Sequence, residues 1–194
     1  MKKLIGLKKV KTAVFISGTG SNLKNLIKFS KTKKSPISIN LIISNTMKAK
    51  GLKYAISNNI EKKIINFKYR GAAEKKIFSL MRKNYIKFIC LAGFMKVLSG
   101  NFINKFNGKI INIHPSLLPK YKGLNTHEKA IKNKDNFSGC TVHFVDKKLD
   151  SGKIIMQKKV RILKNESPIS LAGKIIKQEH KLYPAAISKI FANL

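Results

Sequence analysis

Two side chains that could perform acid–base and hydrogen-bond chemistry close an apolar run near the middle of the chain. Asn112 and His114 stand two positions apart in the sequence KIINIHPSLLP, so an extended strand places them on the same side. An Asn amide can donate a hydrogen bond to a carbonyl oxygen, and a His ring can donate one or carry a proton near neutral pH. A reacting site and a structural, hydrogen-bonded His are both compatible with this pattern.

Carboxylates are scarce in this chain, so each of them is informative. There are 8 Asp and Glu residues against 41 Lys and Arg. Asp150 stands in a Leu-Asp-Ser-Gly turn, and a carboxylate brought against His114 would orient the ring and stabilise its protonated form. A purely turn-forming Asp is the alternative. Metal-free chemistry is favoured, because the His positions 114, 127, 143 and 180 match no zinc spacing.

A glycine-containing loop follows the first apolar run, in the sequence TAVFISGTGSNL. Glycine lets the backbone turn sharply and approach a ligand, and the free N–H groups at the start of a following helix favour an anion. Position 23 is Leu rather than the third Gly of a dinucleotide fingerprint, and no Lys-Ser pair completes a P-loop. The loop therefore favours a single phosphate, with a plain strand-to-helix turn capped by Ser21 as the alternative.

Short β-branched runs and longer amphipathic stretches alternate along the chain, and they must position these groups. Strands are predicted at residues 12–17, 37–43, 63–67, 86–92 and 109–113, with helices at 21–30, 48–58 and 72–84. A loop containing prolines (114–123), a helix (126–132), two strands (141–145 and 154–160) and a last helix (168–191) complete the prediction. Such alternation predicts an α/β fold around a mostly parallel sheet.

Composition points to a folded protein with a large positive charge. The 194 residues are 43% hydrophobic and carry a formal net charge of +33, which suits one domain or a tightly joined pair of halves. A nucleic-acid partner is one interpretation of that charge. Against it, only three of the basic residues are arginine, namely Arg70, Arg82 and Arg161, and the lysines are spread along the whole chain. A Lys-rich composition without any partner is the favoured interpretation.

The chain shows no sign of an oxidising or membrane environment. Cys90 and Cys140 form no Cys-x-x-Cys pattern and are expected to be reduced thiols in the core. The apolar stretch at residues 4–7 is too short for a signal-peptide core, and no run approaches the ~18 apolar residues of a membrane span. We therefore expect a cytoplasmic protein that does not bind membranes.

Five segments carry a resemblance to a known family. They are TAVFISGTGSNLKNLI, LAGFMKVLS (91–99), INIHPSLLPKYKGLNTHEKAI (111–131), GCTVHFVDKKLDSGKIIMQKKV (139–160) and QEHKLYPAAI (178–187). Together they resemble the phosphoribosylglycinamide formyltransferases, in that family's order and with its spacings. The resemblance implies a Rossmann-like fold with helices on both faces of a twisted sheet, an antiparallel strand in the C-terminal part and a long final helix. It also implies a single formyltransferase domain over residues 1–194, with a phosphate-binding half (about 11–108) and a catalytic and folate-binding half (about 109–194).

The resemblance further implies the reaction and the residues that carry it. A formyl group would pass from 10-formyltetrahydrofolate, the co-substrate, to the amine of glycinamide ribonucleotide, an intermediate of purine biosynthesis, with no metal required. Asn112, His114 and Asp150 match the family's catalytic residues, and Glu179 would bind the ribonucleotide. Gly20, Ser21 and Asn22 would hold its phosphate. Met95, Lys96, Val97 and Leu98, with Asn112, would line the folate site. The partners are then these small molecules, with no specific nucleic acid, and the chain is expected to be a monomer or weak homodimer.

One departure and several alternatives accompany the resemblance. The family often has a folate-contacting arginine at the start of the helix after the third strand, which is absent here or displaced to Arg70. Methionyl-tRNA formyltransferase shares the Asn-x-His-Pro segment but lacks the Gly-x-Gly-Ser-Asn loop and adds a C-terminal domain for which 194 residues leave no room. Formyltetrahydrofolate hydrolase normally adds an N-terminal domain. A basic RNA-binding module on a formyltransferase scaffold would have no need of Asn112, His114 and Asp150.

Overall fold

A single twisted sheet forms the centre of the molecule. The structure is a computed structural model that describes residues 9–192, so the stretch at residues 4–7 lies outside it. The strands are β1 (Val10–Ile16), β2 (Ile37–Ser44), β3 (Glu61–Ile64), β4 (Phe88–Leu91), β5 (Lys109–His114), β6 (Phe137–Phe144) and β7 (Ile154–Arg161), and within the described residues their order is β3-β2-β1-β4-β5-β6-β7. Strands β1 to β5 pair in parallel, whereas β6 is antiparallel to both of its neighbours. The predicted α/β class with an antiparallel strand is confirmed.

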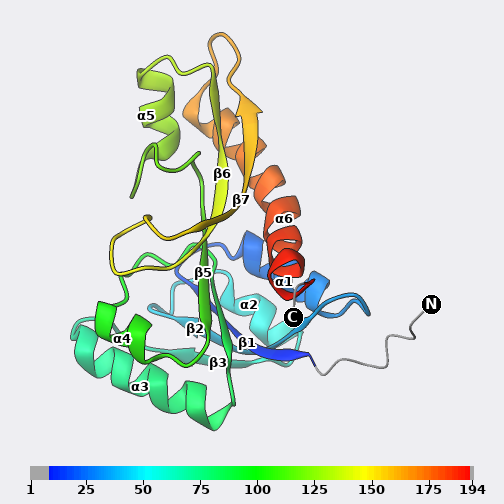
Figure 1. The fold of residues 1–194 in the computed structure, drawn as a ribbon, viewed down its shortest axis with the longest axis vertical. Coiled ribbons are helices and arrows are strands. Elements are labelled where there is room, and N and C mark those ends of the chain that lie inside the picture. The colour runs from blue at the N-terminus through cyan, green and yellow to red at the C-terminus, as the bar shows by residue number, and fades with distance from the viewer. Residues whose placement is uncertain (1–8, 193–194) are drawn as a thin grey trace.

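Helices cover both faces of this sheet, as predicted (Figure 1). The first face carries α1 (Ser21–Ser30), α2 (Leu52–Ser57), α5 (Thr126–Lys132) and α6 (Pro168–Ala192), and the second carries α3 (Arg70–Lys83) and α4 (Gly100–Lys105). Strand β1 shows why two cores form. Val14 and Ile16 pack in the first core, while Ala13 and Phe15 pack in the second, because successive side chains of a strand point to opposite faces.

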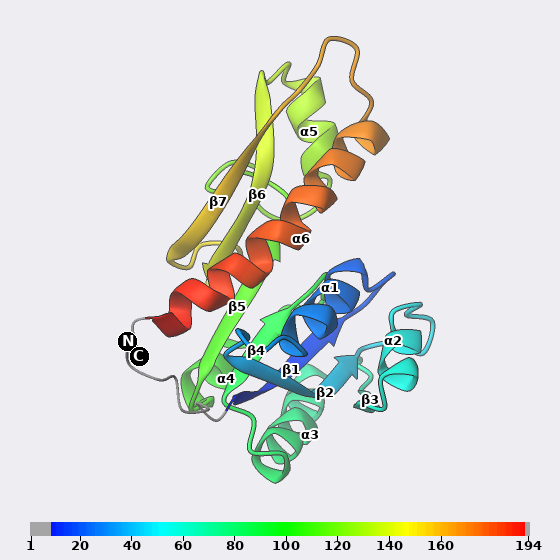
Figure 2. The same ribbon diagram turned by 90° about the vertical axis from the view of Figure 1, so that its right-hand side faces the viewer.

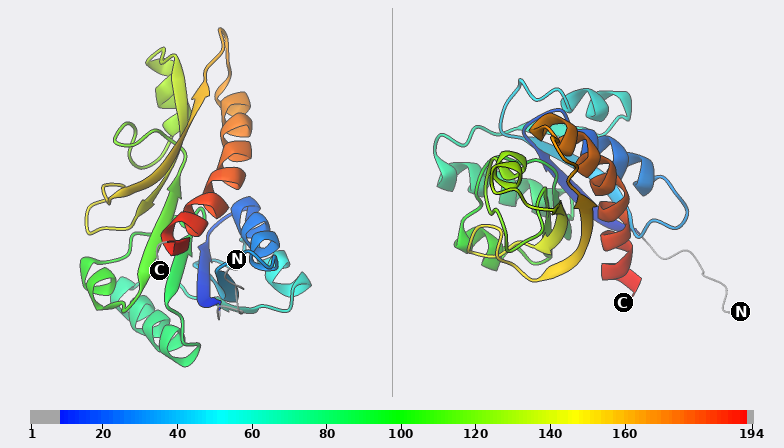
Figure 3. Two further views of the ribbon diagram at one scale, coloured as in Figure 1. Left: turned by 45° about the vertical axis from the view of Figure 1, so that its right-hand side comes forward. Right: turned by 90° about the horizontal axis from the view of Figure 1, so that it is seen from above.

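The long helix α6 ties the two ends of the chain together. Figure 2 shows it running along β6 and β7 and reaching α1, which it contacts. The hydroxyl of Tyr183 on α6 donates to the carbonyl oxygens of Leu91 (2.9 Å) and Ile111 (3.3 Å), on the neighbouring strands β4 and β5. The view from above in Figure 3 places α6 beside α1. One sheet therefore runs through both predicted halves, while the boundary near residue 108 stays a prediction.

Several boundaries differ from the predicted ones for local reasons. Strand β3 covers residues 61–64 rather than 63–67, and Ile65 lies beyond it although its N–H still bonds the Ser44 carbonyl. Helix α2 begins at Leu52 rather than residue 48, after Gly51 has bonded back to the Gly18 carbonyl. Strand β6 begins at residue 137 rather than 141. The six-residue helix α4 was not predicted, because one and a half turns are too short for a periodic pattern.

Two further expectations concern the cysteines and membrane-spanning helices. Cys90 and Cys140 are both buried free thiols, as predicted. Among residues 9–192, no helix combines the length and the apolar character that a membrane crossing needs.

Candidate functional site

A cavity of about 720 Å³ opens over the carboxyl ends of β1, β4 and β5. These strands are neighbours in the sheet, so the loops that leave them converge on one edge. All of the predicted site residues line this cavity: Gly20, Ser21, Asn22, Met95, Lys96, Val97, Leu98, Asn112, His114, Asp150 and Glu179. The fold thus brings together side chains that are up to 159 positions apart in the chain.

The glycine loop forms the wall at the end of β1. Gly20 is the N-cap of α1 and has a left-handed backbone (φ 75°), and a Cβ there would lie 2.6 Å from the Gly51 Cα. Ser21 is therefore the first helical residue and not the N-cap, which corrects the alternative interpretation of this loop. No side chain caps the first turn of α1. Its N–H groups are left to meet an anion in the cavity.

Asn22 on this helix is joined to α6 across the cavity floor. Its Nδ2 donates to Glu179 Oε2 at 2.7 Å, and both side chains are buried. Burial raises the pKa of Glu179, and the hydrogen bond from Asn22 partly opposes this effect. The Asn22 Oδ1 atom is buried without a protein partner. The predicted phosphate-binding residue Asn22 and the predicted ribonucleotide-binding residue Glu179 are therefore hydrogen-bonded to each other. The Asn22 Oδ1 atom remains available to accept a hydrogen bond.

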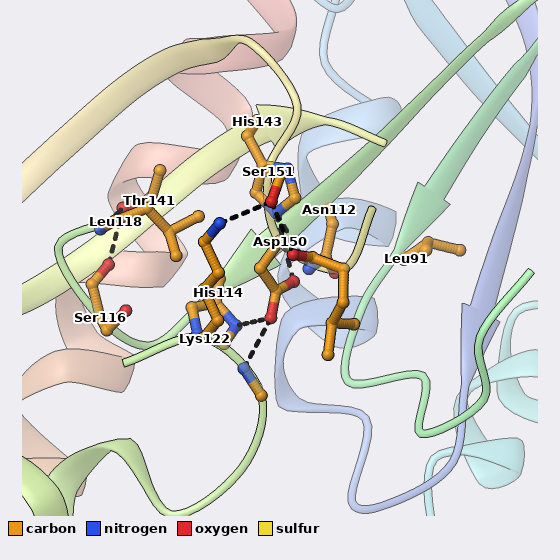
Figure 4. A network of polar contacts seen from close by, with 12 residues as sticks. Leu91, Asn112, His114, Ser116, Leu118, Lys122, Thr141, His143, Asp150 and Ser151 are labelled. Carbon is orange, nitrogen blue, oxygen red and sulfur yellow. Dashed lines mark hydrogen bonds and ion pairs between the residues drawn. The ribbon is translucent and has the colours of Figure 1, made fainter. Parts of the chain in front are cut away.

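His114 and Asp150 are in contact at the end of β5 (Figure 4). The sequence alone did not establish whether these two side chains meet. His114 Nδ1 lies 3.4 Å from Asp150 Oδ2, and both side chains are 7% exposed. On the other edge of the ring, Nε2 donates to the Tyr121 carbonyl at 2.8 Å. The Gly123 N–H donates to Asp150 Oδ2 at 2.9 Å and fixes the carboxylate. Because both groups that face the ring are acceptors, full use of them requires a doubly protonated His114.

His143 completes this network, and sequence reasoning considered it only as a metal ligand. Its Nε2 lies 3.3 Å from Asn112 Nδ2 and 3.7 Å from Asp150 Oδ1, while its Nδ1 donates to the Phe144 carbonyl at 2.8 Å. His143 thereby links Asn112 to Asp150. The antiparallel register of β5 and β6 pairs Asn112 with His143, so this pairing was the available signal.

Burial and the neighbouring polar groups have opposite effects on the pKa values of His114 and Asp150. Burial lowers the pKa of His114 below its ordinary value, while the Tyr121 carbonyl and Asp150 act to raise it. For Asp150, burial raises the pKa, but the contact with His143 and the Gly123 N–H outweigh it and leave the pKa lowered. The site therefore holds a buried carboxylate that favours protonation of the imidazole beside it.

The segment after β4 provides an apolar wall. Met95 and Val97 are exposed large apolar side chains, at 63% and 51%, whereas Leu98 is buried. The Met95 N–H donates to Ser17 Oγ at 2.8 Å, and the segment ends at Ser99, the N-cap of α4. Apolar side chains beside a few polar groups are typical of a pocket for a small organic ligand.

Arg70 and His127 are two further positions that the sequence singled out. Arg70 is the first residue of α3, so an arginine does stand at the start of the helix after β3, but it does not line the cavity. His127 lines the cavity from α5 and has a buried Nδ1 without a protein partner. Within residues 9–192 there is no cluster of three His, Cys, Asp or Glu side chains suited to a metal ion.

Comparisons with known proteins point in one direction. The family model described as formyl transferase matches residues 10–187. Phosphoribosylglycinamide formyltransferase from Haemophilus influenzae is 40% identical over 180 residues, covering 91% of this chain and 85% of that protein. The human trifunctional purine biosynthetic protein adenosine-3 is 41% identical over 186 residues, but the chain spans only 18% of its length.

Solved structures agree with these relatives. The crystal structure of phosphoribosylglycinamide formyltransferase from Anaplasma phagocytophilum has a TM-score of 0.88 and 41% identity, covering 93% of this chain and 86% of that chain. The corresponding structure from Brucella melitensis has a TM-score of 0.89 and 38% identity, covering 94% and 96%.

Proposed function

The chain belongs to the phosphoribosylglycinamide formyltransferase family, and on that basis we propose that it transfers a formyl group from 10-formyltetrahydrofolate to the amine of glycinamide ribonucleotide. The products are formylglycinamide ribonucleotide and tetrahydrofolate, in purine biosynthesis. One observation carries the proposal. The Asn112, His114 and Asp150 side chains belong to one network, joined through His143, inside a cavity whose other wall is a helix start free to bind one phosphate.

The two substrates enter from different walls of the cavity. The ribonucleotide phosphate binds at Gly20, Ser21 and Asn22, where the first N–H groups of α1 carry no side-chain cap. Glu179, joined to Asn22, accepts hydrogen bonds from the same ribonucleotide. The pterin of the folate lies against residues 95–98 and reaches Asn112, so the formyl group and the amine meet beside the catalytic network.

The chemistry is acyl transfer through a tetrahedral intermediate. The amine nitrogen attacks the formyl carbon, the carbonyl oxygen gains negative charge, and the bond from that carbon to the folate nitrogen then breaks. Asn112 Nδ2 donates to the oxyanion. Protonated His114 stabilises the same negative charge. Its Nδ1 lies 3.4 Å from Asp150 Oδ2, a long contact that Nδ1 can exchange for a shorter hydrogen bond to the oxyanion. The amine's proton passes through His114 and Asp150 towards the departing folate nitrogen, which leaves protonated.

A direct assay tests the proposal against its rivals. The purified chain is offered glycinamide ribonucleotide with 10-formyltetrahydrofolate, and separately methionyl-tRNA with the same donor. We expect tetrahydrofolate to form only with the ribonucleotide. Formyl transfer to the tRNA would favour the methionyl-tRNA alternative, and release of formate without an acceptor would favour the hydrolase. No turnover with any acceptor would favour an RNA-binding module on this scaffold.

The remaining expectations belong to the same proposal. Participation of a formyl folate and of no metal, a state of monomer or weak homodimer, and a cytoplasmic location stay predictions. Sedimentation of the purified chain at several concentrations measures the oligomeric state.

A further inference from the structure

The loop between β5 and α5 is held by a polar cluster outside the cavity. The Tyr121 hydroxyl donates to Asp135 Oδ2 at 2.8 Å and accepts from Asn133 Nδ2 at 2.9 Å. Lys120 Nζ lies 3.0 Å from the second oxygen, Asp135 Oδ1, and its side chain is mostly exposed. Neither Tyr121 nor Asp135 lines the cavity. These two side chains therefore have no direct access to a substrate bound there.

The backbone of the same residue touches the reacting network from the other side. The Tyr121 carbonyl accepts the hydrogen bond from His114 Nε2 at 2.8 Å. Ser116 Oγ donates to the Lys120 carbonyl at 2.6 Å, which holds the preceding peptide. Tyr121 has a left-handed backbone, with φ 54°, that a bulky residue rarely adopts. The Tyr121 ring packs against the first core and lies under the Lys120 ammonium, 5.8 Å from the ring centroid. Ser116 Oγ makes a longer contact of 3.4 Å with the Tyr121 carbonyl. The hydrogen bonds of the hydroxyl with Asp135 and Asn133 fix the far end of the ring.

We infer that Tyr121 and Asp135 are positioning residues for His114: their hydrogen bond holds the Tyr121 carbonyl against Nε2, which fixes the orientation of the ring and favours its protonated form. This inference rests on the proposed function for the role of His114. The site residues predicted from sequence all line the cavity, whereas this pair acts through the backbone from behind it. The pair thus acts on the reacting network through the Tyr121 backbone, without touching the substrate.

The charged surroundings of His114 determine the sign of the effect. Burial, His143 and Lys129 lower the pKa of His114, and the Tyr121 carbonyl and Asp150 raise it. His127 of α5 also faces this ring electrostatically. Loss of the carbonyl contact removes a stabilising acceptor, so the pKa of His114 falls further. If protonated His114 is the active form, activity is lost at a lower pH in a variant that frees the carbonyl.

Four variants separate positioning from general damage. Tyr121→Phe and Asp135→Ala remove the hydrogen bond, whereas Asp135→Asn keeps an acceptor oxygen for the Tyr121 hydroxyl. Lys120→Met is the matched control, because it removes the ion pair with Asp135 and the cation over the Tyr121 ring but leaves the hydroxyl contact in place. We expect the first two variants to lose about tenfold in kcat at pH 8, and less at pH 6. Asp135→Asn and Lys120→Met should stay close to the parent.

A second measurement does not depend on the reaction. The His114 ring is titrated by NMR in the free protein, where Tyr121→Phe should lower its pKa and Lys120→Met should not. An unchanged titration, or a loss of kcat that is equal at every pH, would overturn the inference. A shifted titration in a protein that transfers no formyl group would leave the positioning intact and count against the proposed function instead.

Discussion

At the scale of single residues, removal of the negative charge of Asp150 is the most direct test of the proposed catalytic network. Asp150→Asn keeps the shape of the side chain but removes the charge beside His114, 3.4 Å away. We expect turnover to fall by about 10²–10³, the size of a lost transition-state contact, as for Asn112→Ala. Thermal unfolding should change little in either variant, so circular dichroism and steady-state kinetics together check this expectation.

The pH profile of the Asp150→Asn variant has a defined direction. Asp150 raises the pKa of His114, so its neutralisation lowers that pKa. Protonated His114 is then lost at a lower pH, and the alkaline fall in activity moves the same way. Glu61→Gln removes an equal charge on the edge strand β3 and should leave the profile unchanged. Parallel profiles for Asp150→Asn and the parent would contradict the assignment.

The residues of the site differ in how readily the sequence predicts them. Asn112 and His114 follow from strand periodicity, because they are two positions apart on one strand. Asp150 was identified by the scarcity of carboxylates and by family resemblance, since its contact with His114 closes only in three dimensions. His143 was missed because its role depends on the register of β6 against β5. Tyr121 was missed because its carbonyl, which any residue possesses, makes the contact.

At the scale of elements, the turn from β1 into α1 depends on one glycine. Gly20→Ala forces a left-handed backbone on a residue with a Cβ, which costs about 1–2 kcal/mol, and places that atom 2.6 Å from the Gly51 backbone. We expect a clear loss of unfolding free energy in urea and a higher KM for the ribonucleotide. Gly18→Ala is the stability control, because nothing lies within 4 Å of a Cβ there. Equal stabilities of the two variants would contradict the close approach.

The segment at residues 95–98, where we propose that the folate binds, is followed by a contact between two helices. Ser99, the N-cap of α4, donates from its N–H and its Oγ to the two oxygens of the buried Glu74 on α3, each at 2.6 Å. Ser99→Ala should cost about 1–3 kcal/mol, because it removes a cap and leaves a buried carboxylate oxygen unsatisfied. Since Ser99 directly follows residues 95–98, we expect KM for the folate to rise with little change in kcat. Ser99→Thr keeps the hydroxyl and should restore both values, and a fall in kcat alone would argue against a positioning role.

Elements with a strong internal pattern were the predictable ones. The buried parallel strands of the centre and the amphipathic helix α1 lie within one or two residues of their predicted bounds. Helix α4 has six residues, and its start depends on the tertiary contact with Glu74 as well as on Ser99. The edge strand β3 is short and carries exposed lysines, so its apolar residues did not mark its bounds. Local sequence patterns do not predict the bounds of an element that are set by tertiary contacts.

At the scale of the whole molecule, a net charge of +33 remains after all 8 carboxylates are set against the 41 basic residues. Within residues 9–192, three lysines take part in ion pairs with carboxylates: Lys63, Lys120 and Lys174. The other basic side chains create a positive field that extends into solvent. Such a field raises the rate at which anionic molecules meet the protein, and salt screens it over about 8–10 Å at physiological ionic strength.

This field leads to a prediction that separates substrate attraction from a dedicated RNA partner. Both proposed substrates are anionic, so kcat/KM should fall several-fold as NaCl rises from about 20 to 200 mM, while kcat stays nearly constant. Random RNA should bind at low salt and be lost over the same range, because non-specific binding depends on counterion release and its affinity falls steeply with salt. Titration of fluorescent RNA beside steady-state kinetics measures both. RNA binding that persists at 200 mM NaCl would contradict this interpretation, because it would require a built surface that the dispersed lysines do not provide.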